Sequence, residues 1–308
     1  MSSVRARRVV LASVVLLVAL ALGLIALARS HRAIDVLNAL SGGRPQAAEA
    51  DIAYGPLPRH RYDLYRAESA DAPVAIFFHG GGWDSGSKDR FAFVGRGLAA
   101  LGITAALPNY RLGPEPPFPA FMEDAALALD AIRRDVAEGR RVVVIGHSAG
   151  AHIAALLALD EHYLEAAGTT PCEAIAGWIG LAGPYDFLPL NEDRYRAIFP
   201  EATRSESQPV SFAAGPAPDA LLLHGTTDET VHAEDSVILA DRLGAEGNTA
   251  RLMLLEGIDH RAIIAALGRG LGWMAPVREP IAAFAREAWE RSASTACRAS
   301  ETVSASGS

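Results

Sequence analysis

The chain shows two hydrophobic patterns that follow each other along most of its length. Short, mostly apolar runs predict strands at residues 73–78, 103–107, 142–145, 174–181, 220–223 and 250–255, and the run at 142–145 is unbroken. The longer segments between them predict helices, in which apolar residues tend to recur at steps of three and four, at residues 91–101, 118–138, 233–243 and 279–289. Because strands and helices alternate, we expect an α/β fold with a mostly parallel central sheet and helices on both faces.

Two stretches fit this alternation less well. Residues 60–66 alternate in polarity and predict an edge strand of the sheet. Gly183 and Pro184 close the strand at 174–181, and residues 185–218 then show mixed polarity, scattered aromatic residues and no long period. We therefore expect a short insert that forms a small lid.

The N-terminal segment differs in character from the body. Three arginines within the first eight residues precede 20 uncharged residues, 9–28, which are enough to cross the hydrocarbon core of a bilayer. A transmembrane signal-anchor helix is the favoured interpretation, and a signal peptide cleaved at the small residues 26–28 is the alternative. The leading arginines predict an inside N-terminus and an exported body, periplasmic or extracellular, although Arg29 and Arg32 weaken the charge asymmetry.

These patterns divide the chain into four parts. We expect the signal-anchor or signal peptide in residues 1–30, a linker in 31–50, one folded domain in 51–291 and a disordered tail in 292–308. The tail is assigned as disordered because serine and alanine dominate it.

Composition narrows the range of partners. The formal net charge is −8 and the body has no basic stripe, so we expect no nucleic-acid partner. No CxxC motif or cluster of histidine and cysteine indicates a metal, and no other cofactor is expected.

The chain has two cysteines, Cys172 and Cys297. Because Cys297 lies in the tail, we expect two free thiols, with a disulfide as the alternative in an exported protein. The sequence indicates no particular oligomeric state.

Residues 146–150 read Gly-His-Ser-Ala-Gly, between the strand predicted at 142–145 and an alanine-rich stretch that favours helix. A tight strand-to-helix turn is therefore expected, in which Gly146 and Gly150 remove Cβ atoms that would collide. Such a turn holds Ser148 in a strained backbone conformation and pushes its hydroxyl outward. The pattern is that of the GxSxG nucleophile elbow, which predicts Ser148 as a nucleophile.

A serine hydroxyl needs an adjacent base, usually a histidine that a carboxylate orients. Asp228 and His260 follow two later predicted strands, and the order Ser, Asp, His is that of α/β-hydrolase triads. We therefore predict Ser148 as nucleophile, Asp228 as the orienting acid and His260 as the base. The alternatives are Asp235 or Glu229 for the acid and His232 for the base.

The other polar residues near these motifs have structural interpretations. His147 and His152 flank the nucleophile and are expected to pack or form hydrogen bonds beside it. His224 is expected to anchor the end of a strand. Asp259 is expected to be a turn residue.

A second motif, His-Gly-Gly-Gly at residues 79–82, follows the strand predicted at 73–78. Attack on an ester carbonyl places negative charge on its oxygen, and that charge needs fixed hydrogen-bond donors. Glycines let backbone N–H groups approach such an oxygen without side chains in the way. This loop and the N–H of Ala149, the residue after the nucleophile, therefore predict an oxyanion hole.

Several motifs occur together in one order, namely HGGGW at 79–83, PNYRL at 108–112, FPAF at 118–121 with Glu123 and Asp124, GHSAG at 146–150, GPYD at 183–186, HGTTD at 224–228 and EGIDH at 256–260. In this the chain resembles the bacterial α/β-hydrolase esterases of the HGGG type. That group is similar to hormone-sensitive-lipase-like carboxylesterases and to feruloyl or acetylxylan esterase-like enzymes. The resemblance spans residues 51–289.

The resemblance implies which residues act. It assigns the triad as above and the oxyanion donors as Gly80, Gly81 and Ala149. Two departures concern the acyl and alcohol pockets: the usual aspartate before Tyr-Arg-Leu is Asn109, and the insert after Gly183 is short.

From the motifs and the resemblance we expect a serine carboxylester hydrolase that acts on small to medium acyl esters through an acyl-enzyme. Trp83, Tyr185 and Phe187 are expected at the substrate pocket. The alternative is an amidase or formamidase resembling kynurenine formamidase, which also carries an HGG loop. A further alternative is a membrane-tethered binding protein that has lost catalysis.

Overall fold

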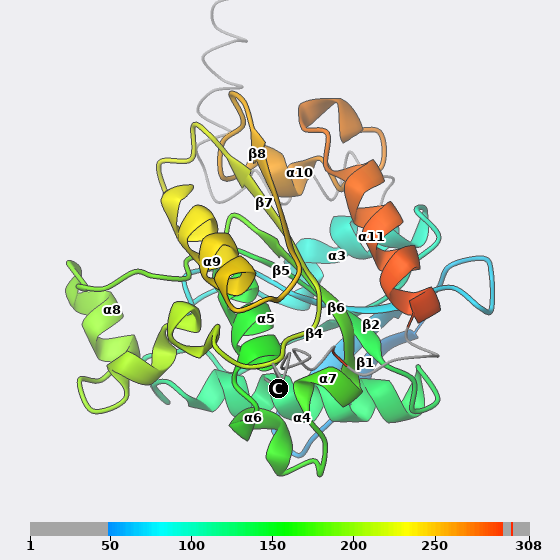
Figure 1. The fold of residues 1–308 in the computed structure, drawn as a ribbon. Helices are drawn as coiled ribbons and strands as arrows, with labels where there is room; N and C mark the ends of the chain where they lie inside the picture. The colour runs from blue at the N-terminus through cyan, green and yellow to red at the C-terminus, as the bar shows by residue number, and fades with distance from the viewer. Residues whose placement is uncertain (1–48, 292–296, 298–308) are drawn as a thin grey trace, which may run out of the picture.

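The computed structural model describes residues 49–291 and residue 297, which form a central sheet flanked by helices (Figure 1). Eight strands lie in the order β1-β2-β4-β3-β5-β6-β7-β8. Their bounds are β1 Glu49–Ala53, β2 Arg61–Tyr65, β3 Val74–Phe78, β4 Thr104–Pro108, β5 Val142–His147, β6 Ile175–Leu181, β7 Ala220–Gly225 and β8 Ala250–Leu255. The first strand begins close to the domain start predicted at residue 51.

The sheet is mostly parallel, as the alternation of strands and helices predicts. The strands from β4 to β8 in the spatial order pair in parallel, and only β1 and β2 run antiparallel to their neighbours. Residues 60–66 contain β2, but the expectation of an edge strand there is wrong. The strand β1 covers its outer side, with Ala53 opposite Arg61 and Glu49 opposite Leu64.

Helices cover both faces of the sheet. Their bounds are α3 Ala92–Ala99, α4 Ala120–Asp135, α5 Ala149–Leu159, α6 His162–Glu165, α7 Pro171–Ala174, α8 Asp193–Ile198, α9 Glu234–Ala245, α10 Ala262–Ala265 and α11 Arg278–Arg291. Short 3₁₀ turns are η1 Lys88–Phe91, η2 Arg204–Ser207, η3 Pro209–Phe212 and η4 Gly272–Met274.

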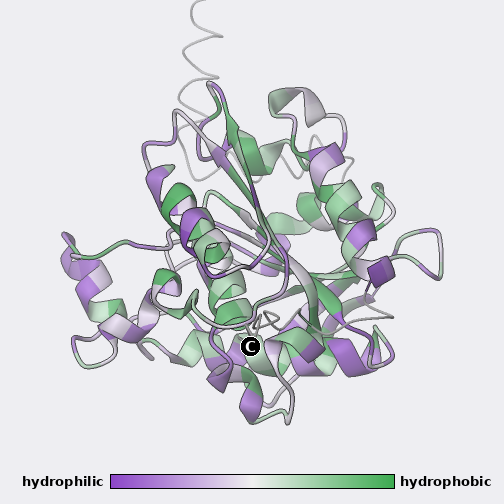
Figure 2. Cartoon of the chain, in the orientation of Figure 1, coloured by the Kyte–Doolittle hydropathy of each residue, from purple (hydrophilic) through white to green (hydrophobic). Residues whose placement is uncertain are grey.

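Two hydrophobic cores lie on the two faces of the sheet. One face packs against α4, α5 and α9, and the other against α3, α10 and α11. Almost every residue of α5 is buried, so this helix is apolar around its circumference, whereas α4 and α11 carry polar residues on one side (Figure 2). The helix that follows the predicted nucleophile is therefore held at the centre of the molecule.

The insert after β6 packs over the end of the sheet. It contains α8 and the turns η2 and η3, joined by irregular segments. Phe199, just after α8, is fully buried, and its ring meets the Trp83 ring edge-on at a centroid distance of 4.8 Å. The insert therefore contacts the segment that follows β3.

A disulfide joins Cys172 in α7 to Cys297, beyond the end of α11. The expectation of two free thiols is wrong. Near this bond, Arg141 donates to the carbonyl of Arg291 at 3.1 Å and to that of Cys172 at 3.3 Å, and so links the end of α11 to α7. The two cysteine Cα atoms lie 5.2 Å apart, although 125 positions separate them in the sequence.

Within residues 49–291, no helix combines the length and the apolar character needed to cross a membrane. The predicted anchor at residues 9–28 and the linker up to residue 48 lie outside the described residues. The predicted tail lies outside them as well, apart from Cys297.

Candidate active site

The turn after β5 has the geometry of a nucleophile elbow. β5 ends at His147, and Ser148 then has φ 55° and ψ −125°, immediately before α5 begins at Ala149. A positive φ strains a residue with a side chain, so the surroundings must hold it there. A Cβ on Gly146 would collide with the Gly150 carbonyl, and a Cβ on Gly150 would collide with the carbonyl oxygen of the last residue of β3. The two glycines are therefore needed for the backbones to approach this closely.

Asp228 and His260 follow β7 and β8 and meet beyond the ends of these strands. Asp228 Oδ2 lies 2.7 Å from His260 Nδ1, and Oδ1 accepts the N–H groups of Thr230 at 2.8 Å and Val231 at 2.9 Å. Burial disfavours the ionised carboxylate, but hydrogen bonds from His224 and His260 outweigh it and hold the pKa of Asp228 below its usual range. An ionised carboxylate therefore faces Nδ1 and leaves Nε2 as the nitrogen that can accept a proton.

Ser148 and His260 line one cavity of about 840 Å³. The cavity lies at the carboxyl ends of the parallel strands, where α/β sheets bind their ligands. Ser148 is half-buried and the His260 side chain is 13% exposed, while Asp228 is buried behind the imidazole. Within residues 49–291 and at Cys297, no group of three or more histidine, cysteine, aspartate or glutamate side chains is arranged to hold a metal ion.

The alternative acid and base have other surroundings. Asp235 Oδ2 accepts the N–H of Tyr185 at 3.0 Å. Glu229 and His232 are exposed, although His232 lies at the cavity wall. The carboxylate bonded to His260 is that of Asp228.

The glycine loop after β3 lies against the nucleophile turn. Gly80 and Gly81 line the cavity, and a Cβ on Gly80 would be 3.0 Å from the His147 carbonyl oxygen and 3.1 Å from the Ser148 Cβ. Gly81 has φ 136°, which favours glycine. Ala149 is the first residue of α5, and N–H groups in the first turn of a helix have no partner within it. Backbone donors from the loop and from the helix therefore lie on either side of Ser148.

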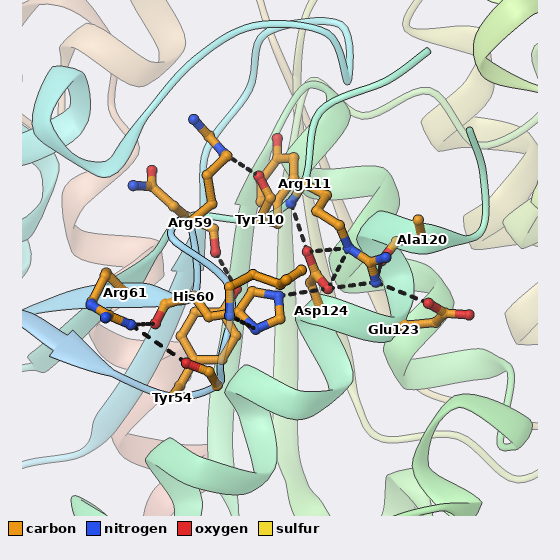
Figure 3. A network of polar contacts seen from close by, with 12 residues as sticks. Tyr54, Arg59, His60, Arg61, Tyr110, Arg111, Ala120, Glu123 and Asp124 are labelled. Atoms are coloured by element: carbon orange, nitrogen blue, oxygen red, sulfur yellow. Dashed lines mark hydrogen bonds and ion pairs between the residues drawn. The ribbon is translucent and has the colours of Figure 1, made fainter. Parts of the chain in front are cut away.

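A polar network behind the glycine loop holds the segment that follows β4 (Figure 3). The buried carboxylate of Asp124 accepts the backbone N–H of Arg111 at 2.7 Å and its Nε–H at 2.8 Å. His60 Nε2 lies 3.0 Å from the same carboxylate, and Arg59 Nε donates to the Tyr110 carbonyl at 2.6 Å. Motif reasoning reached Asp124 and Arg111 through the resemblance but missed Arg59 and His60, which stand alone in the sequence without a pattern.

Tyr110 connects this network to the glycine loop. Its hydroxyl donates to the His79 carbonyl at 2.7 Å, and its ring stacks on the His79 imidazole at 4.4 Å. Burial lowers the pKa of His79 to about 4, so the ring is neutral. Arg59 also donates to the Gly86 carbonyl at 3.1 Å. The glycine loop is therefore held by the neutral His79 ring, the Tyr110 hydroxyl and the Arg59 guanidinium.

Asn109, which replaces the usual aspartate of the family pattern, has a structural role. Its Oδ1 accepts the N–H of Lys88 at 2.7 Å, and its carbonyl accepts the hydroxyl of Tyr54. Its side chain is buried, and the cavity walls are formed by other residues. The substitution therefore acts on the scaffold rather than on the pocket.

His152 joins the glycine loop to the lid. Its Nδ1 accepts the indole N–H of Trp83 at 3.1 Å, and its Nε2 lies 2.7 Å from the Ser207 carbonyl. Burial lowers the pKa of His152 to about 4, so the ring is neutral and its one N–H points to Ser207. As expected, His152 is a hydrogen-bonding neighbour of the nucleophile turn.

Of the three aromatic residues expected at the pocket, Trp83 and Phe187 line the cavity and Tyr185 does not. The ring of Tyr185 is fully buried and meets Trp178 edge-on at 6.2 Å. A Cβ on Gly180 or Gly183 would collide with its phenol, so these glycines create the space that it fills. The placement of Tyr185 at the pocket is corrected accordingly.

Known proteins resemble this chain in sequence and in fold. The BD-FAE family model matches residues 62–243. The isoprenylcysteine alpha-carbonyl methylesterase ICME of Arabidopsis thaliana is 31% identical over 237 residues, which cover 68% of this chain and 55% of the relative. The esterase LipC of Mycobacterium tuberculosis is 31% identical over 228 residues, which cover 63% of this chain and 54% of the relative. The chain thus spans about half the length of the curated relatives it matches.

Among solved structures, Thermogutta terrifontis esterase 2 with bound propionate aligns with a TM-score of 0.63 and 23% identity, over 80% of this chain and 94% of that one. At this identity the likeness concerns the fold, which is that of the α/β-hydrolases. Because the family model covers more than half of the residues, the chain belongs to the BD-FAE family.

Proposed function

We propose that this protein is a serine carboxylester hydrolase that works through an acyl-enzyme. The observation that carries the proposal is the strained Ser148, which lines one cavity with His260, whose Nδ1 is paired with the buried Asp228. The two relatives named above, a methylesterase and an esterase, support an ester as the bond that is cleaved.

Acylation begins with proton transfer. His260 Nε2 takes the proton of Ser148 Oγ while Oγ attacks the carbonyl carbon of the ester. Asp228 stabilises the imidazolium through the 2.7 Å contact at Nδ1. The imidazolium then donates its proton to the leaving alcohol, and the acyl group stays on Ser148.

The glycine loop and α5 supply the charge stabilisation. When the carbonyl carbon becomes tetrahedral, its oxygen carries negative charge and accepts hydrogen bonds from the N–H groups of Gly80, Gly81 and Ala149. The same donors act again when His260 activates a water molecule that attacks the acyl-enzyme and releases the acid. The donors belong to a rigid loop and a helix end, so little reorganisation is needed during the reaction.

We propose small to medium acyl esters as substrates. The cavity of about 840 Å³ lies in the upper part of the range of roughly 300–1,000 Å³ that small-molecule sites occupy. Trp83, Phe187 and Leu190 give it apolar walls, and the lid is short. No step of this reaction needs a cofactor.

The test is substitution of the nucleophile in the full-length protein. Ser148→Ala should abolish turnover of p-nitrophenyl acetate, while circular dichroism shows an unchanged fold. Ser211→Ala, at an exposed serine of η3 outside the cavity, is the matched control and should retain full activity. Equal turnover by Ser148→Ala and the parent would contradict the proposal.

An amidase or formamidase would use the same triad on another bond. We expect kcat/KM for p-nitrophenyl acetate to exceed that for N-formylkynurenine, and the reverse order would establish the formamidase. A binding protein without catalysis would fail to react with a fluorophosphonate probe.

We also propose that residues 9–28 anchor the protein in a membrane and that the folded body is exported. The Cys172–Cys297 disulfide supports export, because disulfides persist in oxidising compartments. In cells whose outer membrane has been removed and whose inner membrane is intact, an external protease should digest the body. Digestion that requires lysis of the inner membrane would place the body in the cytoplasm and contradict the proposal.

A further inference from the structure

His147 makes a contact that the catalytic steps above do not use. It is the last residue of β5 and the neighbour of Ser148, and its side chain is buried. Its Nε2 lies 3.0 Å from the backbone carbonyl oxygen of His260, and the two imidazole rings lie 4.8 Å apart. The residue beside the nucleophile therefore contacts the residue that serves as base.

The order of the strands in the sheet shows why His260 needs a contact with β5. β8, which leads to His260, is separated from β5 by β6 and β7. Strands in a sheet lie about 4.8 Å apart, so the loop after β8 must extend across roughly 14 Å to reach the nucleophile.

The part of this loop that lies close to β8 is held by the segment that follows β7. Thr227 N–H donates to the Ile258 carbonyl at 3.2 Å, and Gly257 N–H donates to the Thr226 hydroxyl at 3.0 Å. The far part, at His260, is held through its side chain by Asp228 and through its backbone by His147. Of these two contacts, only the one from His147 comes from the strand that carries Ser148.

We propose that His147 is a positioning residue that fixes the distance between the base and the nucleophile by donating its Nε2–H to the carbonyl of His260. The inference rests on the proposed function, because it assigns His260 as the base. It predicts an effect on kcat rather than on substrate binding, since His147 acts on the geometry of proton transfer from Ser148.

The protonation state of His147 suits this role. The His260 carbonyl can only accept a hydrogen bond, so Nε2 of His147 must carry the proton. Burial lowers the pKa of His147 to about 3, with a smaller contribution from the charge of His260. The ring is therefore neutral at ordinary pH, in the tautomer that donates to the His260 carbonyl.

Three substitutions of His147 distinguish the effect of its Nε2–H donor from the effect of its ring as a packed group. His147→Gln places an amide N–H near the position of Nε2, His147→Asn places it near Nδ1, on the Gly80 side, and His147→Phe keeps a ring without a donor. Loss of the bond and a displacement of the base should lower kcat by about 10- to 100-fold in the Asn and Phe variants, with KM unchanged. The Gln variant should stay within about 3-fold of the parent. His162→Phe, at an exposed histidine of α6, is the matched control and should leave kcat unchanged.

The full-length protein serves for the kinetic measurements, with p-nitrophenyl acetate as substrate. Parental kcat in the Asn or Phe variant would overturn the inference, and so would an equal loss in all three folded variants. If the parent hydrolyses p-nitrophenyl acetate and His260→Ala does not, such results refute only the positioning role of His147. The proposed function then stands. If His260→Ala remains active, the proposed function itself fails.

A second measurement needs no variant and covers the case in which the substitutions do not fold. Nitrogen-15 NMR of the histidine-labelled parent should show His147 neutral, with its proton on Nε2, throughout pH 5–8. A proton on Nδ1, or a charged ring in this range, would overturn the inference.

Discussion

Replacement of Asp228 by asparagine tests how the triad is organised. Asparagine has the same shape but offers one oxygen and one NH₂ group. The oxygen must stay with the N–H groups of Thr230 and Val231, which Oδ1 now accepts, because an NH₂ there would face two donors. The NH₂ group therefore faces His260 Nδ1. The imidazole can accept that bond only if its proton moves to Nε2, which then donates toward Ser148 and cannot take its proton.

The size of the effect follows from two losses. The 2.7 Å contact between Asp228 and His260 is charge-assisted in the imidazolium state, and its loss costs about 2–3 kcal/mol. Return to the active tautomer sets a buried N–H against the NH₂ group, which costs about 2–3 kcal/mol more. Together these amount to about 4–6 kcal/mol, or a loss of roughly 1,000- to 25,000-fold in kcat at 1.36 kcal/mol for each factor of ten.

The assay is hydrolysis of p-nitrophenyl acetate at pH 7.5, from which kcat is determined. A cooperative thermal unfolding transition shows that the variant is folded. Asp259→Asn is the matched control, because Asp259 Oδ1 accepts the N–H groups of Arg261 at 2.9 Å and Ala262 at 2.7 Å, and an amide oxygen can do the same. The control should keep its activity. A folded Asp228→Asn variant with more than a tenth of the parental kcat would refute the reasoning.

Three further predictions concern stability. Gly146→Ala should lower the free energy of unfolding by about 3 kcal/mol, because its Cβ would meet the Gly150 carbonyl, and a urea midpoint equal to that of the parent would contradict this packing. Replacing Cys172 and Cys297 together by serine should cost about 2–5 kcal/mol, because the disulfide closes a loop across 125 positions, and a parent whose urea unfolding is insensitive to reductant would count against the bond. Burial lowers the pKa values of His79, His147 and His152 from 6.5 to about 4, 3 and 4, so that below pH 6.5 the unfolded chain binds protons that the folded protein does not. The free energy of unfolding should therefore fall as the pH decreases from 7 to 5, and urea titrations that show no decrease would contradict the neutral state of these rings.

Local sequence patterns predict the strands and helices well where burial is uniform. The runs of valine, isoleucine and leucine in β5 and β7 mark central strands because both of their faces are covered. β1 was not predicted, because Glu49–Ala53 is short, contains two acidic residues and only one large apolar residue, and is mostly exposed. A strand of this kind is defined by its pairing with β2 rather than by its own residues, and so the edge of the sheet was misplaced.

Contacts between distant segments escape the same reasoning. Nothing near Cys297 indicates that α11 brings it back to α7, since the packing of that helix is a property of the whole fold. Tyr185 follows a strand end, like the residues of the site, but the absence of side chains at Gly180 and Gly183 directs its ring into the core. The motif residues could be recognised because the elbow and the glycine loop are each encoded within five consecutive residues.

We propose above all that Ser148 is the activated nucleophile of an ester hydrolase. Stepwise titration of the full-length protein with a fluorophosphonate, followed by peptide mass spectrometry, tests it most directly. Activity should fall in proportion to the label and reach zero at one adduct per chain, located on Ser148. Activity that survives complete labelling, or a single adduct on another residue, would contradict the claim.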